Sequence, residues 1–255
     1  MQNLFFKEIG YGNVTVVLIH GFCESHRIWE PLATKLSEKY RILVPDLPGF
    51  GESPLPNEGS LSIAHVGAIM LDWLQGQGIR YSIVIGHSLG GYVALAMGMV
   101  SPDSFRGVGL FHSTAYADSP EKKENRNKVI EFVARNGEKP FVESLMPSLF
   151  YKKDHPALPF ALEIGYQTHA KTVISYTGAM RDRPDKTDFL KTFEKPILIV
   201  AGVHDQAVRI EDSKEQAKLP KHPELQILTE SAHMGMFEQE SESLDILNKF
   251  ILRCI

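Results

Sequence analysis

The stretch Ile83-Val-Ile-Gly-His-Ser88-Leu-Gly-Gly91 decides how this chain folds and where its chemistry lies. An apolar, β-branched run leads into a G-x-S-x-G motif, and a helical pattern follows directly. This context predicts a sharp turn from a buried strand into a helix, with the hydroxyl of Ser88 presented at the carboxyl end of the strand. A bare motif of this kind also occurs by chance in glycine turns, but the flanking strand and helix and the additional Gly91 argue against that interpretation. We therefore predict that Ser88 is a nucleophile.

Short apolar runs on both sides of this motif predict strands that are buried on both faces of a mostly parallel sheet. These runs are residues 14–19, 42–44, 82–85, 107–111, 196–201 and 224–228. The amphipathic stretches that predict helices are residues 28–39, 61–76, 89–100, 210–217 and 243–252. The alternation predicts an α/β fold with a mostly parallel, twisted sheet and helices on both faces. We also expect residues 4–10 to form an antiparallel edge hairpin with residues 14–19.

Residues 116–190 interrupt this alternation. The segment contains several prolines and the charged run 121–128, and it lacks a strand-like run. Helical patterns cover residues 129–134 and 160–175. We predict a helical cap at residues 116–190, inserted into an α/β core formed by residues 1–115 and 191–255, with the charged run as a solvated helix face.

The composition excludes several classes of protein. The 255 residues include 27 Lys and Arg against 31 Asp and Glu, a balance that gives no basic surface for nucleic acid or an anionic membrane. The amino terminus lacks the pattern of a secretory signal, and no apolar run reaches the roughly 20 residues that cross a bilayer. Cys23 and Cys254 have neither metal nor redox spacing. We expect a cytoplasmic protein without nucleic-acid, membrane, metal or cofactor partners, and the oligomeric state stays open.

A serine hydroxyl needs a base beside it and an acid that holds the base. Among the ten histidines, His233 follows the last strand-like run in a loop of small residues, at the sheet edge where Ser88 is expected. Asp205 follows the preceding strand, which produces the order Ser, Asp, His. Glu211 and Asp212 are alternatives for the acid, although they stand where a helix is expected to begin.

Backbone groups complete the predicted site. His20-Gly-Phe22 follows the strand at residues 14–19, and the glycine lets the next backbone N–H face the nucleophile. We predict that the N–H groups of Phe22 and Leu89 form an oxyanion hole. We expect His87 to point away from the reacting hydroxyl and His20 to be a supporting hydrogen-bonding residue.

Together these residues resemble the α/β-hydrolase superfamily over essentially the whole chain. The matching stretches, in family order, are residues 20–22, Asp46-Leu-Pro-Gly-Phe-Gly-Glu-Ser53, residues 86–90, Asp205 and His233. The resemblance implies that the insertion is the family's cap and that residues 46–53 shape the pocket floor. Dehalogenases and epoxide hydrolases of this fold use aspartate in place of Ser88. The serine members, which include carboxylesterases, lactonases, C–C bond hydrolases and cofactor-free haloperoxidases, are therefore favoured.

The sequence thus predicts a serine hydrolase that cleaves a carboxylic ester with a small or medium acyl group through an acyl-enzyme intermediate. The alternatives are a C–C bond hydrolase, lactonase or lyase with the same triad, and a ligand receptor without turnover. Apolar side chains of the cap, and those in or next to the predicted oxyanion loop at residues 20–22, are candidates for the substrate pocket. Those in the cap are equally suited to pack in the core of the cap itself. The candidates are Phe22, Cys23, Phe141, Met146, Leu149, Phe150 and Met180.

Overall fold

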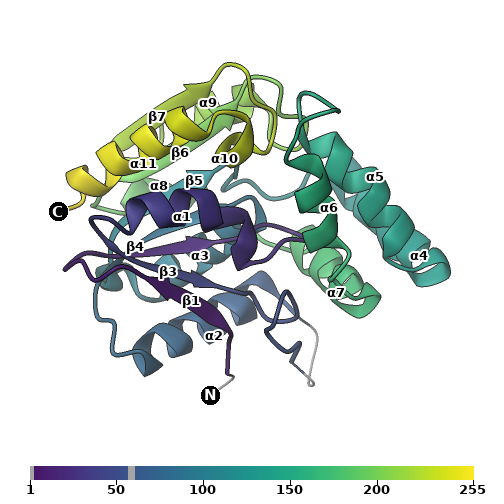
Figure 1. Ribbon diagram of the computed structural model, residues 1–255, viewed down its shortest axis with the longest axis horizontal. Helices are drawn as coiled ribbons and strands as arrows, with labels where there is room; N and C mark the ends of the chain where they lie inside the picture. The colour runs from purple at the N-terminus through teal and green to yellow at the C-terminus, as the bar shows by residue number, and fades with distance from the viewer. Residues whose placement is uncertain (1–2, 57–60) are drawn as a thin grey trace.

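The computed structural model describes residues 3–56 and 61–255; residues 1–2 and 57–60 of the predicted core lie outside this description (Figure 1). In the described part of the chain, seven strands form one sheet in the order β1-β3-β2-β4-β5-β6-β7. The strands are β1 (Phe6–Ile9), β2 (Thr15–Ile19), β3 (Arg41–Pro45), β4 (Ser82–His87), β5 (Phe105–Phe111), β6 (Ile197–Gly202) and β7 (Pro223–Leu228). All neighbouring pairs are parallel except β1 and β3. The predicted α/β class is confirmed.

The partner of the first strand differs from the expected one. β1 pairs antiparallel with β3, with Phe6 opposite Pro45 and Ile9 opposite Ile42, and not with the strand at residues 15–19. The reason is that β2 already has β3 on one side and β4 on the other, so it has no free edge. The predicted edge strand is therefore correct, and the predicted hairpin is wrong.

Helices cover both faces of the sheet, as predicted. Val17 and Ile19 of β2 belong to one buried cluster, whereas Val16 and Leu18 belong to another, because successive side chains point to opposite faces. The first cluster includes side chains of α2 (Ile63–Gly76), α3 (Leu89–Val100) and α8 (Thr187–Thr192), and Ala217 just beyond α9 (Ile210–Gln216). The second includes side chains of η1 (His26–Trp29), α1 (Glu30–Leu36), α10 (Gly235–Glu238) and α11 (Glu240–Arg253). The short η2 (Pro102–Ser104) connects α3 to β5.

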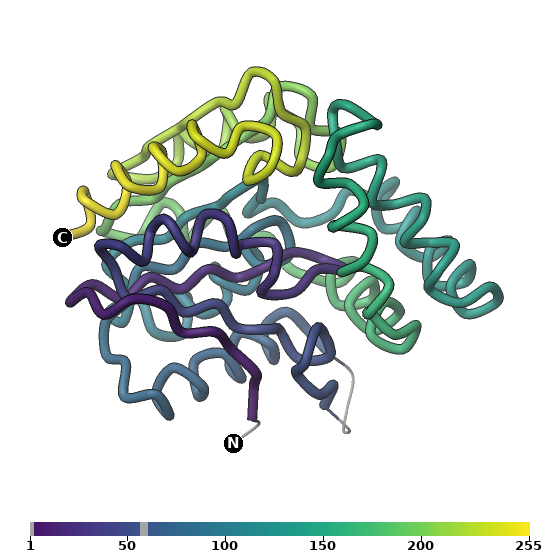
Figure 2. Tube along the Cα trace, in the orientation of Figure 1, coloured from purple at the N-terminus to yellow at the C-terminus, as the bar shows by residue number. Residues whose placement is uncertain are grey.

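Four helices form an excursion between β5 and β6, which can be followed in teal and green in Figure 2. They are α4 (Pro120–Asn136), α5 (Lys139–Leu149), α6 (Leu158–Gly165) and α7 (Ala170–Arg181). The charged run lies on α4, where residues 121–125 are exposed. The helix expected at residues 160–175 is split, because α6 packs on α5 while α7 packs on α4. Among the described helices, none is long and apolar enough to pass through a bilayer.

The loop at residues 46–53 anchors this excursion to the core. The hydroxyls of Tyr176 and Thr172 on α7 donate to the carbonyl oxygens of Pro48 and Gly49 at 2.9 and 3.0 Å. Gly49 has a φ of +88°, a conformation that favours glycine. The ring of Phe50 packs between Tyr176 of α7 and Phe22 of the loop after β2. The loop thus holds α7 against the core, and none of its residues lines the cavity over Ser88.

Candidate active site

The parallel strands bring distant parts of the sequence to one edge of the sheet. β2, β4, β5, β6 and β7 are consecutive neighbours that point in the same direction, so their carboxyl ends lie side by side. Ser88 directly follows β4, Asp205 follows β6 and His233 follows β7. Side chains beyond these ends converge on a crevice, where ligands bind in sheets of this type.

Ser88 occupies a strained turn between β4 and α3. Its φ is +49° and its ψ −112°, a conformation that non-glycine residues rarely adopt. A Cβ atom at Gly86 would collide with the backbone of Gly90, so this turn needs small residues at both positions. The Ser88 N–H donates to the carbonyl of Phe111 at 3.0 Å, and the Ser113 hydroxyl donates to the Ser88 carbonyl at 2.7 Å. The turn is therefore held by β5 and the loop after it.

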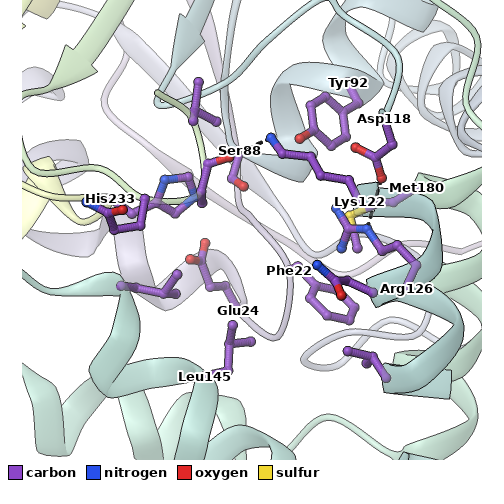
Figure 3. A pocket seen from close by; sticks show the side chains of 16 residues that line it. Phe22, Glu24, Ser88, Tyr92, Asp118, Lys122, Arg126, Leu145, Met180 and His233 are labelled. Atoms are coloured by element: carbon purple, nitrogen blue, oxygen red, sulfur yellow. Dashed lines mark hydrogen bonds and ion pairs between the residues drawn. The ribbon is translucent and has the colours of Figure 1, made fainter. Parts of the chain in front are cut away.

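His233 and Asp205 form a buried hydrogen-bonded pair beside this turn. His233 Nδ1–H donates to Asp205 Oδ2 at 2.7 Å. With its hydrogen on Nδ1, the ring keeps Nε2 as an acceptor. Ser88 and His233 line the same cavity, and Figure 3 shows the His233 ring next to Ser88. The three residues named from the sequence thus lie at one site.

The electrostatics of the pair keep the carboxylate charged. Burial opposes ionisation of Asp205, but His233 and His112 outweigh it, and the pKa of Asp205 lies far below its usual value. Burial likewise favours neutral His233, but the Asp205 carboxylate outweighs burial and raises the pKa of His233 above its ordinary value. The carboxylate therefore stabilises the protonated form of the imidazole.

The alternative acids stay away from this site. Asp212 forms a bidentate ion pair with Arg209 at 2.8 and 3.0 Å, and Glu211 is exposed in the first turn of α9. His204, the neighbour of Asp205, stacks on Tyr151 with ring centroids 3.6 Å apart. Of the candidate acids, Asp205 is the one that contacts His233.

Sequence reasoning missed His112, which follows β5 with a φ of +50°. Its Nδ1 lies 3.2 Å from the same Asp205 oxygen that accepts from His233. The other oxygen of Asp205 accepts from the N–H groups of Ala207 and Val208 at 2.8 and 2.9 Å. Burial lowers the pKa of His112 to about 4, so the ring is neutral at neutral pH and donates through Nδ1. Its position after a central strand is the signal that could have identified it.

His112, Asp205 and His233 also have the chemistry of metal ligands, with ligand atoms within 4.8 Å of one another. Both Nδ1 atoms, however, lie at hydrogen-bond distance from one carboxylate oxygen, 2.7 and 3.2 Å away. A cation bound to both Nδ1 atoms would replace these two hydrogen bonds. The geometry of the group is therefore that of a carboxylate held by four N–H donors.

A second buried pair, Glu24 and His87, connects the loop after β2 to His233. Glu24 Oε2 accepts from the Gly21 N–H at 2.5 Å and lies 2.9 Å from His87 Nδ1. His87 Nε2 lies 2.9 Å from the carbonyl oxygen of His233. His87 therefore points away from the Ser88 hydroxyl, as expected, and links two loops of the site. Glu24 was not predicted as a site residue, because its contact with His87 joins segments that are 63 positions apart.

The loop after β2, which holds the predicted oxyanion residue Phe22, adjoins the start of α3. Leu89 is the first residue of α3, so its N–H has no acceptor within the helix. A Cβ atom at Gly90 would collide with the carbonyls of Ile19 and His20, which shows how closely α3 approaches the end of β2. His20 accepts from the Leu47 N–H at 2.9 Å through Nε2, the supporting contact expected of it.

A cavity of about 250 Å³ lies over Ser88 and His233, between the sheet edge and the excursion (Figure 3). Its apolar wall consists of Phe22, Tyr92, Val129, Leu145, Leu149, Met180, Ala207 and Val208. Its polar wall consists of Glu24, Ser88, Asp118, Lys122, Asn125, Arg126, Gln206 and His233. The wall thus combines the core's sheet edge with side chains from α4, α5 and α7.

Of the predicted pocket residues, Phe22, Leu149 and Met180 line this cavity, and the structure places Cys23, Phe141, Met146 and Phe150 outside its wall. Met146 and Phe150 are fully buried in the cluster that joins the excursion to the core. Cys23 is also buried, its thiol bonds to Thr168, and burial raises the pKa of that thiol well above its ordinary value. The side chains of Cys23, Met146 and Phe150 therefore pack in the interior between the excursion and the core and do not face the cavity.

Comparisons with known proteins agree with this architecture. The family model described as the alpha/beta hydrolase fold matches residues 14–240. A pimeloyl-[acyl-carrier protein] methyl ester esterase of Wigglesworthia glossinidia brevipalpis is 34% identical over 115 residues, which are 45% of this chain and 42% of that relative's length. The matched region thus spans less than half of that relative.

Two solved structures superpose on nearly the entire chain. A thermophilic esterase from Thermogutta terrifontis has a TM-score of 0.92 at 27% identity, over 98% of this chain and 93% of that one. An enol-lactonase from Burkholderia xenovorans LB400 has a TM-score of 0.90 at 21% identity, over 98% and 96% of the two chains. At that lower identity the likeness concerns the fold alone.

Proposed function

This chain belongs to the α/β-hydrolase fold family, and we propose that it is a serine hydrolase that cleaves a carboxylic ester with a small or medium acyl group. The observation that carries the proposal is the hydrogen bond of 2.7 Å between His233 and Asp205 beside the strained Ser88. The cavity that Ser88 and His233 share has an acyl-sized volume of about 250 Å³ and a largely apolar wall.

In the proposed mechanism, Ser88 Oγ attacks the ester carbonyl while His233 Nε2 accepts the hydroxyl proton. Asp205 holds the ring in the required tautomer and stabilises the imidazolium that forms. The N–H groups of Phe22 and Leu89 stabilise the oxyanion of the tetrahedral intermediate. His233 then protonates the leaving alcohol, and it activates the water that releases the acid from Ser88.

We further propose that residues 116–190 serve as a cap over this site, inserted between core segments 1–115 and 191–255. In support, Val129 and Leu145 of the excursion line the same cavity as Ser88. The cap would exclude water from the acyl group and select its length and shape.

The test combines a covalent probe with a panel of esters. A fluorophosphonate is expected to label the protein on the peptide that contains Ser88, as read by mass spectrometry, because the probe reacts with activated serines. p-Nitrophenyl esters of increasing acyl length are expected to be hydrolysed, with a decline at long chains. Labelling without turnover of any ester would favour the C–C bond hydrolase or lyase alternative. Neither labelling nor turnover would favour a ligand receptor.

The pH dependence of the reaction follows from His233. The neutral ring is the active base, and the Asp205 carboxylate raises the pKa of His233 above its ordinary value of 6.5 despite burial. Activity should therefore decline as pH falls through a midpoint above 6.5. The measurement is kcat/KM for a neutral ester from about pH 5 to about pH 9. A midpoint below the ordinary histidine value would contradict the proposed role of the carboxylate.

A further inference from the structure

The cap wall of the cavity carries charge at a distance from the proposed nucleophile. Figure 3 shows Asp118 and Arg126 on the side of the cavity away from His233, whereas the Lys122 ammonium reaches back toward Ser88. Lys122 and Arg126 lie on α4, and Asp118 lies just before that helix. The proposed ester chemistry uses none of these side chains.

Buried contacts fix the orientation of Arg126. The side chain of Asp118 is 1% exposed, and its Oδ2 accepts from Arg126 Nε at 3.1 Å. Its Oδ1 accepts from Arg183 Nη1 at 2.8 Å. Arg183 is itself buried and lies over the ring of Tyr92, 3.9 Å from the centroid. Arg183 therefore fixes the Asp118 carboxylate, and this carboxylate orients the Arg126 guanidinium through the bond to Nε.

The remaining edge of the Arg126 guanidinium is available for a ligand. Within residues 3–56 and 61–255, its contacts include the bond from Nε to Asp118 and none from Nη1 or Nη2. A guanidinium fixed through Nε presents its two terminal nitrogens as a fork, and this fork matches a carboxylate. Its side chain is 25% exposed, so a small anion can reach it from the cavity.

The charge of the wall favours an anion. Arg126 in the wall and Arg183 behind it share one carboxylate, Asp118, and Lys122 adds a third positive charge to the wall. The Lys122 ammonium donates to the Ala207 carbonyl at 3.2 Å. This acceptor is uncharged, so it does not neutralise the positive charge of the ammonium. The other carboxylate in the wall, Glu24, is hydrogen-bonded by the Gly21 N–H and His87.

Apolar side chains accompany these charges in the cavity wall. They include Phe22, Val129 and Met180, whose hydrocarbon and thioether surfaces suit an apolar chain and offer no partner to a charged group. A ligand that satisfies the cavity therefore has an ester group at Ser88, an apolar chain, and an anionic group at the other end.

We propose that Arg126 binds a carboxylate at the far end of the substrate, so that the preferred substrates are monoesters of dicarboxylic acids. This inference rests on the proposed ester hydrolysis and assigns a substrate class to the same site. Asp118 and Arg183 are positioning residues for the Arg126 guanidinium.

Two esters of equal chain length test the proposal. The p-nitrophenyl monoester of adipic acid and p-nitrophenyl hexanoate differ only in a terminal carboxylate or methyl group. Wild-type protein is expected to have a kcat/KM about 10-fold or more higher for the adipate monoester. Arg126→Gln is expected to lower the ratio of the two kcat/KM values by about 10- to 100-fold, chiefly through KM, because a charge-assisted hydrogen-bond pair is lost.

Arg135→Gln is the matched control. Arg135 lies on the same helix α4, its side chain is 77% exposed and its partner is Glu131 on the surface. This variant should keep the wild-type ratio. A second measurement is inhibition of hexanoate ester hydrolysis by adipate, whose inhibition constant should rise about 10-fold or more in Arg126→Gln and stay unchanged in Arg135→Gln.

The outcomes separate the two proposals. Hydrolysis of the hexanoate ester with no preference for the monoester, or an unchanged ratio in Arg126→Gln, overturns the carboxylate subsite and leaves the ester hydrolase intact. Failure of wild-type protein to hydrolyse either ester overturns the proposed function and, with it, the subsite.

Discussion

Ser88→Ala is expected to lower kcat for ester hydrolysis by at least about 10⁴-fold, because the acyl-enzyme cannot form without the hydroxyl. Fluorophosphonate labelling should disappear in the same variant. The protein should keep its stability, since the Ser88 side chain makes no capping hydrogen bond to α3 and alanine tolerates the turn's positive φ no worse than serine. The measurements are single-substrate kinetics, labelling followed by mass spectrometry, and a thermal melt.

Ser101→Ala is a suitable control for this experiment. Ser101 follows the other end of α3, where its hydroxyl bonds to that of Ser104, a half-buried residue, at 2.7 Å. Its removal should leave kcat and labelling unchanged. Ester turnover near the wild-type rate in Ser88→Ala would show that another group is the nucleophile, and the proposed mechanism would fail.

Asp205→Asn is expected to lower kcat by about 10⁴-fold while the fold persists. The amide oxygen of the substituted side chain can still accept the two backbone N–H bonds, but an NH₂ group then stands where both His233 and His112 donate. His233 must accept from this group through Nδ1, which places its hydrogen on Nε2. That tautomer cannot take the proton of Ser88, so the loss falls on kcat rather than on KM.

Asp212→Asn tests the specificity of that effect. Asp212 was one of the two alternative acids named from the sequence, and its carboxylate pairs with Arg209 at the start of α9. Its substitution should change kcat little, because the Asp212 carboxylate bonds to Arg209 and not to His233. The loss of stability should also be small, because surface ion pairs contribute about 0–1 kcal/mol. A large loss in Asp212→Asn together with near-normal activity in Asp205→Asn would reverse the assignment of the acid.

Much of the fold was accessible from local patterns. The run Ile83–Ile85 before Gly86, the small residues around Ser88 and the helical pattern after Leu89 are all contained within one short stretch of the chain. The runs in the middle of the sheet are apolar on both faces, and this property can be read directly from the sequence. The run at residues 224–228 was also predicted to be buried on both faces, but it forms the edge strand β7, which is partly exposed because it has a neighbour on one side only. The partner of the first strand was missed because strand pairing depends on which edges other strands leave free.

The parts of the site that escaped prediction depend on contacts between distant segments. His112 contacts Asp205 across 93 positions, and Glu24 contacts His87 across 63. Cys23, Met146 and Phe150 were predicted as pocket residues on their apolar character, but apolar side chains on a helix suit a core equally well. Only the packing of the helices decides which of them face the cavity.

The sequence by itself therefore determined the fold class and indicated the three residues of the proposed triad, because the turn around Ser88 and the loops after the strand-like runs can be recognised locally. The tertiary structure alone decided how that site is supported and what it can bind. The four donors around Asp205 come from the loops after three strands, and the orientation of Arg126 depends on Asp118 and on Arg183, which is 65 positions from that aspartate. Such contacts join residues that are far apart in the chain. They form only when the folded chain brings distant segments together and buries them, and a short run of neighbouring residues does not show which segments will meet.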